Sequence, residues 1–347
     1  MAIKRITMQD IADACGLSRN TVSKIFNGRG AVPEATRRMV LERAQELGYH
    51  HSIKEIPGAP VISKQNIALF TCNMPSNYHF GTFFVPAFAE HLSRAGYTLT
   101  MHQLSEEDLR QGKLPGHVSL DQTAGILGIE LFHKDYADMI CGLGLPTIFV
   151  DTFSGATASP LEYDLVSMEN VASTVALTNH VIAEGAKQIG FVGDINHCNS
   201  FHERWLGFSL ALNHVNIPLN RSLCILESDG PRYSDPAWLL TQLKAMRPLP
   251  DAFICANDFI ALHLITALKL FGVSIPNRVM VTGFDGTPQS AILEPSLTTV
   301  QIPNADIGRI AADNLLKRIE NPDRPFCITY VTTSPVWRNS TARNKAI

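Results

Sequence analysis

The spacing of apolar residues changes twice along the chain, and each change marks a predicted boundary. In residues 1–50 the apolar positions repeat with a helical period, which predicts three short amphipathic helices. Residues 51–64 lose that period and contain two prolines and a glycine, as is typical of a linker. From residue 65 onward, short apolar runs alternate with helical segments, which predicts βαβ units and parallel sheets. The pattern therefore predicts an α/β protein preceded by a small all-α domain.

The alternating part of the chain falls into two consecutive series, which predicts two lobes. Expected strands are 67–70, 98–101, 125–129 and 147–150 in the first series, and 189–192, 223–226, 252–254 and 279–282 in the second. Expected helices are 83–95, 169–183, 201–214, 237–246 and 259–271. Open α/β sheets bind ligands beyond the carboxyl ends of their strands, so residues that follow these runs are candidate site residues.

The first two predicted helices have the layout of a helix-turn-helix. Thr7 and Asp10 have the spacing of a capping box, Gly16 supplies a tight turn, and Ser18 is placed to cap the second helix. Arg and Lys pair with guanine and Asn with adenine in the major groove, so the predicted base readers are Arg19, Asn20 and Lys24. Predicted phosphate or positioning contacts are Thr7, Ser18, Thr21, Ser23 and Asn27. The alternative is a helical hairpin with a solvated polar face.

Charge is distributed unevenly along the chain. The net charge of the whole sequence is −3, but residues 1–64 hold ten Lys and Arg against six Asp and Glu, which leaves the remainder acidic. Only the N-terminal segment is therefore suited to a phosphate backbone. The seven cysteines are scattered and never spaced CxxC, so we expect free thiols, no metal site and no cofactor. No apolar run is long enough for a membrane span, and we expect a cytoplasmic protein.

Five ordered segments carry a family resemblance. They are "MQDIADACGLSRNTVSKIFNG", "RWLGFSLAL", "AFICANDFIALHLITALKLFGVSIP", "VMVTGFDG" and "EPSLTTVQIPNADIGRIAADNLL". With these the chain resembles LacI/GalR-type transcriptional regulators over nearly its whole length. The resemblance implies a helix-turn-helix headpiece at 1–50, a hinge at 51–64, and an effector-binding and dimerisation core at 65–340 with a two-lobed periplasmic-binding-protein-like fold. It places the N-lobe at 65–158 and 291–321, and the C-lobe at 159–290 and 322–340. It also places the three crossings between lobes near 151–164, 284–290 and 321–325.

Four polar residues stand where such a core would bind its effector. Asp151, Asn257 and Asp285 each follow a predicted strand, and Arg204 opens a helix. Carboxylates accept from vicinal hydroxyls while Arg and Asn supply donors, a set that fits a polyhydroxylated ligand. The resemblance implies that these four contact a sugar effector, with Tyr233, Tyr78 and Phe80 as aromatic walls. The alternatives are helix or turn caps for the polar residues, an ion pair for Arg204, core positions for the aromatic rings, and a purine or other metabolite as effector.

The chain departs from the family pattern in two places that affect function. The hinge segment reads "YHHSIKEIPGAP", with Gly58 about where the family has a leucine that wedges into the minor groove, so we expect little or different operator bending, with Ile56 as a substitute wedge. The C-terminus has no leucine heptads, which favours a homodimer over a tetramer.

The sequence thus predicts a dimeric repressor that binds a pseudo-palindromic DNA operator and is controlled by a small carbohydrate-like effector, with activation at some promoters left open. A doubly wound enzyme is the first alternative, but GxGxxG, GxSxG and P-loop motifs are missing, so no catalytic residue is assigned. A transport binding protein is the second, but it would have no use for the headpiece.

Overall fold

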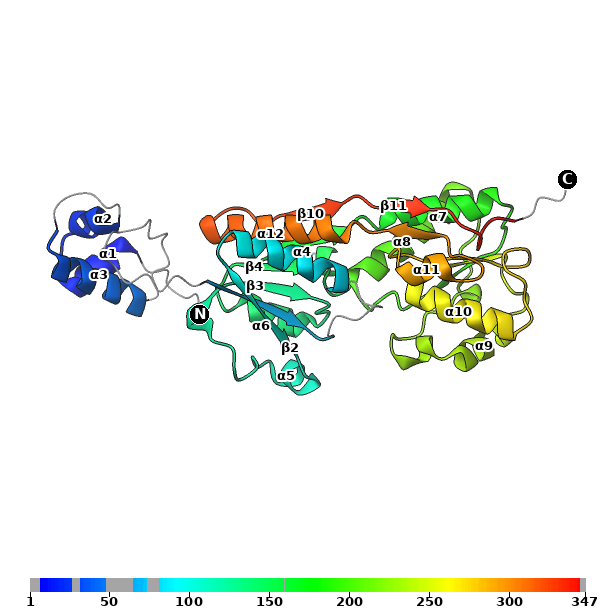
Figure 1. The fold of residues 1–347 in the computed structure, drawn as a ribbon, viewed down its shortest axis with the longest axis horizontal. Coiled ribbons are helices and arrows are strands. Elements are labelled where there is room, and N and C mark those ends of the chain that lie inside the picture. The colour runs from blue at the N-terminus through cyan, green and yellow to red at the C-terminus, as the bar shows by residue number, and fades with distance from the viewer. Residues whose placement is uncertain (1–6, 27–31, 48–64, 74–80, 159, 344–347) are drawn as a thin grey trace. The chain divides into compact units, whose positions relative to one another are not determined.

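The computed structural model describes residues 7–26, 32–47, 65–73, 81–158 and 160–343 (Figure 1). The chain divides into two compact units, Met1–Ser63 and Lys64–Ile347. The predicted hinge at 51–64, with Ile56 and Gly58, lies outside the described residues. Within the described residues, no helix combines the length and the apolar character needed to cross a membrane.

The first unit contains the three expected helices, α1 (Met8–Cys15), α2 (Arg19–Phe26) and α3 (Glu34–Glu46). Thr7 and Asp10 form the capping box, and Gly16 ends α1 with a φ of 64°. This left-handed conformation favours glycine because a Cβ atom would be strained there. The three helices enclose a small core of buried side chains, which are Ile11, Ala12, Val22, Ile25, Phe26, Val40 and Ala44.

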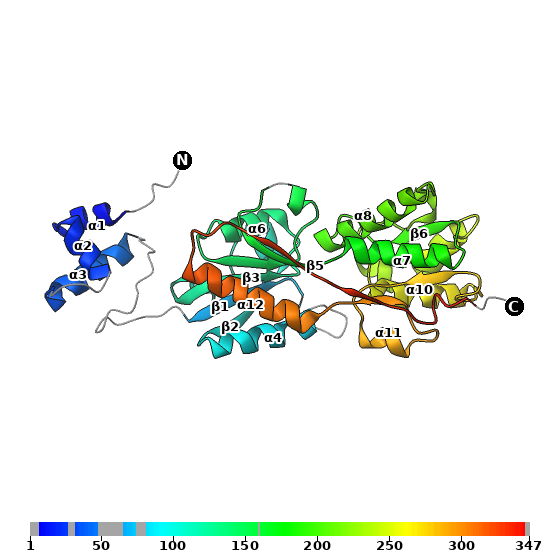
Figure 2. The same ribbon diagram turned by 90° about the horizontal axis from the view of Figure 1, so that it is seen from above.

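The first lobe of the second unit is built on a six-stranded parallel sheet (Figure 2). In spatial order its strands are β10 (Ile328–Val331), β5 (Asp164–Met168), β4 (Thr147–Val150), β3 (Thr123–Ile129), β1 (Asn66–Thr71) and β2 (Thr98–Gln103). Helices α4 (Gly81–Arg94) and α12 (Asn304–Glu320) pack against each other and share one buried cluster with the sheet. Helix α6 (Lys134–Cys141) shares a second cluster with it, and α5 (Glu106–Gln111) follows β2.

The second lobe has a three-stranded parallel sheet of β6 (Ile189–Val192), β7 (Ala252–Cys255) and β8 (Met280–Thr282). Its helices are α7 (Val171–Ala183), α8 (Asn199–His214), α9 (Pro236–Ala245), α10 (Asp258–Leu270) and α11 (Pro288–Ile292). Two short strands, β9 (Thr299–Gln301) and β11 (Ser334–Val336), pair antiparallel. Single 3-10 turns occupy Leu120–Gln122, Ala156–Ala158, Arg221–Leu223 and Pro231–Ser234. The strand expected at 223–226 was wrong, since only one bridge joins Val192 to Ile225.

The predicted lobe boundaries were also wrong at two strands. Strands β5 and β10, which we assigned to the C-lobe, belong to the sheet of the first lobe. A buried ion pair helps to hold them there: the Arg318 guanidinium on α12 donates to both carboxylate oxygens of Asp164, at 2.9 and 3.1 Å. The backbone amide of Cys327 donates to the same carboxylate. The first and third crossings therefore lie at about 169–171 and 332–333, where Glu169 N–H donates to the carbonyl of Val331.

Candidate functional site

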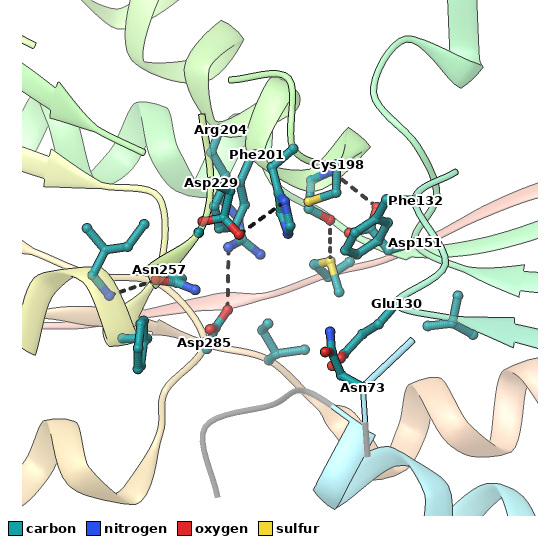
Figure 3. A pocket seen from close by; sticks show the side chains of 18 residues that line it. Asn73, Glu130, Phe132, Asp151, Cys198, Phe201, Arg204, Asp229, Asn257 and Asp285 are labelled. Atoms are coloured by element: carbon teal, nitrogen blue, oxygen red, sulfur yellow. Dashed lines mark hydrogen bonds and ion pairs between the residues drawn. The ribbon is translucent and has the colours of Figure 1, made fainter. Parts of the chain in front are cut away.

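A cavity of about 300 Å³ lies between the carboxyl ends of the strands of the two lobes (Figure 3). The sequence placed Asp151, Arg204, Asn257 and Asp285 at one site, and all four line this cavity. Glu130 and Asn73 face it from the first lobe, while helix α8 contributes Ser200 and Phe201, with Cys198 just before it (Figure 3). The cavity is therefore shared by both lobes, so its shape depends on their relative position.

Three carboxyl groups in the cavity stand on residues with positive φ that lie shortly after the ends of strands. Glu130 follows β3 with a φ of 50°, Asp151 follows β4 with a φ of 57°, and Asp285 lies beyond β8 with a φ of 120°. Residues other than glycine rarely adopt such backbone angles, and backbone strain of this kind is concentrated at binding sites. Sequence reasoning missed Glu130, although it follows the run "GILGI" just as Asp151 follows "TIFV".

The Arg204 side chain forms the centre of the polar cluster and is buried, with 3% of its surface exposed. Its Nε donates to Oδ1 of Asn170 at 2.9 Å, and its Nη1 donates to the carbonyl of Ala256 at 2.6 Å. Nη1 also lies 3.4 Å from Oδ1 of Asp285. The guanidinium covers the ring of Phe284, with its carbon 3.7 Å from the ring centroid. Four contacts thus fix the group in one orientation, as ligand recognition requires.

Burial changes the protonation of the carboxyl groups around this cluster. Loss of solvent raises the pKa of Asp285 to about 7; Arg204 opposes the rise, while the charges of Asp258 and Glu130 add to it. Burial also raises the pKa of Asp151, against the effect of hydrogen bonds from Ser200 and Thr152. Asp285 is therefore poised to change charge near neutral pH.

Asp151 and Asn257 combine a capping role with a place in the cavity. Oδ1 of Asp151 accepts from the backbone amides of Thr152 and Ser200, the latter in the first turn of α8. Oδ1 of Asn257 accepts from the amide of Ile260 as the N-cap of α10, and its Nδ2 group is not needed for that bond. Both residues therefore cap a turn or helix, as the alternative interpretation predicted, and also line the cavity.

The expectation that Tyr233 faces the ligand was wrong. Its side chain is buried in the core of the second lobe, packs edge-on against Trp238, and donates to the carbonyls of Ile225 and Glu227. The aromatic rings that line the cavity are instead Phe132, Phe201 and Phe259, with His197 against Phe132. Phe201 and Phe259 lie in the first turns of α8 and α10, and Phe132 follows β3, so the sequence alone does not separate these rings from core positions. Tyr78 and Phe80 lie outside the described residues.

In the headpiece the predicted base readers Arg19, Asn20 and Lys24 are exposed on α2. The predicted contacts Thr7, Ser18 and Thr21 take part in capping: the Ser18 hydroxyl oxygen accepts from the Thr21 amide at 3.1 Å and pairs with its hydroxyl. Ser23 is half-buried, and Asn27 lies outside the described residues.

Known proteins resemble the chain in both units. Residues 7–52 match the family described as "Bacterial regulatory proteins, lacI family", and residues 178–341 match a "Periplasmic binding protein-like domain". The transcriptional repressor PurR of Photobacterium profundum is 27% identical over 340 residues, which cover 96% of this chain and 98% of the relative. The transcriptional regulator reg1 of Streptomyces lividans is 27% identical over 348 residues, which cover 96% of each chain.

Solved structures show the same fold. The regulator CelR in complex with cellobiose is 24% identical with a TM-score of 0.71, and the match covers 97% of this chain and 100% of that one. A lac repressor dimer bound to operator and an anti-inducer is 22% identical with a TM-score of 0.68, covering 97% of this chain and 99% of that one. Headpiece, fold and relatives agree: the chain joins a lacI-family DNA-binding domain to a periplasmic-binding-protein-like domain, as its relatives do, and is a DNA-binding transcriptional regulator.

Proposed function

We propose that this regulator is a repressor whose operator affinity is controlled by a neutral, polyhydroxylated small molecule, a sugar or glycoside, bound in the cavity between the lobes. The observation that carries the proposal is the orientation of Arg204 beside Asp285, at a cavity that is also lined by the carboxyl groups of Glu130, Asp151 and Asp229. A cavity of about 300 Å³ is at the small end of the usual range for ligand sites.

The charge of the cavity favours hydroxyl groups over anions. Asp151, Asp285 and Glu130 supply carboxylate oxygens that accept from hydroxyls, and Arg204 is the one arginine or lysine among the lining residues described. A phosphorylated sugar would meet four carboxyl groups for one guanidinium, since Asp229 also lines the cavity. The rings of Phe132 and Phe201 offer apolar surface for a sugar face.

The assembly belongs to the same proposal. A homodimer would present two headpieces to a pseudo-palindromic operator, in the way that the lac repressor binds its operator as a dimer. In each headpiece Arg19, Asn20 and Lys24 are proposed to read bases, with Thr7, Ser18, Thr21, Ser23 and Asn27 as phosphate or positioning contacts. The effector then acts only if it binds one arrangement of the lobes more tightly than the other.

A thermal-shift screen tests the effector assignment. The purified protein is melted with sugars, glycosides, polyols, sugar phosphates and nucleobases, alongside Arg204→Ala and a control, Arg94→Ala, whose side chain is exposed on α4. A ligand at about a hundredfold over its Kd stabilises the folded state by about 2.7 kcal/mol, which is easily measured. The proposal expects a sugar to raise the melting temperature of the wild type and of Arg94→Ala but not of Arg204→Ala. A nucleobase or a phosphate as the sole hit would replace the sugar class.

A further inference from the structure

We infer that Asn170, Glu203 and Tyr330 are positioning residues for Arg204, so that a contact from the first lobe sets the orientation of this guanidinium in the second. The inference rests on the proposed role of Arg204 in effector binding and names the residues that regulate that site. It follows from a continuous run of hydrogen bonds from strand β10 to the cavity.

Asn170 links Arg204 to Glu203 through the two ends of one side-chain amide. Its Oδ1 accepts from Nε of Arg204 at 2.9 Å, and its Nδ2 donates to Oε2 of Glu203 at 2.7 Å and to the carbonyl of Met168 at 2.9 Å. The residue is 1% exposed, so each of these bonds forms without competition from water.

The helix that Asn170 precedes is capped by another residue. Asn170 stands at the N-cap of α7, where an Asn side chain ordinarily accepts from a backbone amide of the first turn, but it makes no such bond. The Glu169 carboxylate accepts from the amides of Ala172 and Ser173 instead, at 2.5 and 3.0 Å. The position of Asn170 is therefore explained by its contacts with Glu203 and Arg204 rather than by helix capping.

Glu203 connects this amide to the first lobe. The buried carboxylate accepts from Asn170 on one oxygen, and from Nδ2 of Asn199 at 2.9 Å and the hydroxyl of Tyr330 on the other. Burial and the bond to Glu203 raise the pKa of the Tyr330 phenol, so its hydroxyl stays protonated as a donor. Glu203 lies on α8 of the second lobe, whereas Tyr330 lies on β10, the edge strand of the first-lobe sheet.

The network crosses between lobes where two connecting segments run side by side. Glu169 N–H donates to the carbonyl of Val331 at 2.8 Å, and the Thr333 hydroxyl donates to the carbonyl of Glu169. A change in the relative position of the lobes therefore alters the Tyr330–Glu203 bond and, through Asn170, the orientation of the guanidinium. By linkage, a ligand that fixes Arg204 favours the lobe position that keeps the bond.

The test needs no ligand and uses the full chain labelled with ¹⁵N-arginine. The Nε–H resonance of Arg204, assigned from its loss in Arg204→Lys, is followed by hydrogen exchange in the wild type and in Tyr330→Phe. The matched control is Tyr136→Phe, which removes a hydroxyl that donates to the carbonyl of Lys113 within the first lobe. Tyr330 is 45% exposed, so its substitution by Phe leaves the fold intact.

We expect hydrogen exchange at the Arg204 Nε–H to be about tenfold faster in Tyr330→Phe than in the wild type, because tenfold corresponds to the free energy of about one hydrogen bond. In Tyr136→Phe the exchange rate should be unchanged. Glu203→Gln, which replaces an acceptor of the Asn170 amide, should speed it at least as much. Equal exchange in the wild type and Tyr330→Phe, or an equal increase in both Tyr→Phe variants, would overturn the inference. If exchange is faster in Tyr330→Phe but no sugar stabilises the protein in the thermal-shift screen, the positioning role of Asn170, Glu203 and Tyr330 stands and the proposed sugar effector does not.

Discussion

At the residue scale, the cavity concentrates carboxyl groups that the fold keeps from full solvation. Asp285 is held beside Arg204 and near Asp258, whose own carboxyl accepts from Thr287 and Thr299 and whose pKa burial raises to about 6. Burial is the main cause of the raised pKa of Asp285, and repulsion from the charge of Asp258 adds to it, so the single arginine does not return the pKa to its ordinary value. The cavity is thus sensitive to pH at values near neutrality.

The raised pKa of Asp285 gives a prediction for stability. Its folded-state pKa of about 7 lies above the ordinary value of 3.8, so the folded protein binds the proton more tightly than the unfolded chain. Stability contributed by this proton is present at acidic pH and is lost as the pH rises through about 7. When the pH is lowered from 7.5 to 5.5, we expect the free energy of unfolding of the wild type to rise by roughly 1–2 kcal/mol relative to that of Asp285→Asn.

The measurement is chemical unfolding of both proteins at each pH. The difference between the two proteins reports on residue 285, because every other residue of the sequence is the same in both. Asn matches Asp in size and shape, so the variant removes the ionisable group with little other change at this position. A difference that stays constant over this pH range would show that Asp285 keeps an ordinary pKa.

At the element scale, hydrophobic periodicity predicted most of the elements that contain continuous apolar runs, and it missed others, among them the 17-residue helix α12. Helices α8 and α10 begin within two residues of their predicted starts, because both carry extended apolar faces. Strands β5 and β10 were missed: β5 is fully buried yet its sequence "DLVSM" contains Asp164 and Ser167, and β10 is a half-exposed edge strand. The buried Asp164 carboxylate is compensated by Arg318, which lies 154 residues further along the chain, so the local sequence does not reveal the pair.

That buried pair supplies a second prediction. The Arg318 side chain is 3% exposed and that of Asp164 is 1% exposed, so removing either partner leaves a buried charge without compensation. Arg318→Met should lower the free energy of unfolding of the second unit by about 3–5 kcal/mol, measured by urea unfolding. Arg94→Ala is the control: it breaks an exposed pair with Glu90 and should cost about 1 kcal/mol or less. Similar small losses in both variants would mean that Arg318 does not hold β5 in the sheet.

Residues of the candidate site could be predicted from the sequence where they follow a strand that could itself be predicted. Asp151, Asn257 and Asp285 were found because each follows a buried run, and Glu130 follows the same rule. Tyr233 was misassigned because the sequence does not show that its hydroxyl reaches two backbone carbonyls inside the core. Asn170 and Tyr330 carry no local signal, since their contacts with Glu203 span 33 and 127 positions of the chain.

Helix α2 of the headpiece gives a third prediction. Arg19 is exposed at its start, and a guanidinium that pairs with guanine contributes about 1–3 kcal/mol of discrimination between bases. Arg19→Ala should therefore weaken binding to the selected operator about tenfold or more and relax the preference at one position. Thr21→Val keeps the backbone amide that Ser18 caps, and should weaken binding to all sequences alike. Equal losses on operator and random DNA for both variants, measured by fluorescence anisotropy, would remove Arg19 as a base reader.

At the scale of the whole molecule, the chain joins a DNA-binding unit to a ligand-binding unit of two lobes. The lobes are connected by three crossing segments, and the cavity is lined from both sides. Carboxylates from the first lobe reach the second directly, since Asp151 accepts from an amide of α8. A ligand that binds across this boundary favours one lobe arrangement, and the free energy of that preference is what is available to change operator affinity.

Operator affinity with and without effector, in the wild type and in Arg204→Ala, shows whether a ligand in the cavity controls DNA binding. An operator fragment selected in vitro with the wild-type protein is titrated by fluorescence anisotropy, with the sugar identified by thermal shift absent or saturating. We expect the sugar to change the Kd for the operator about five- to 150-fold in the wild type and not at all in Arg204→Ala, which binds the operator with wild-type affinity when no sugar is present. An equal response to the sugar in both proteins, or no response in the wild type, would contradict this expectation.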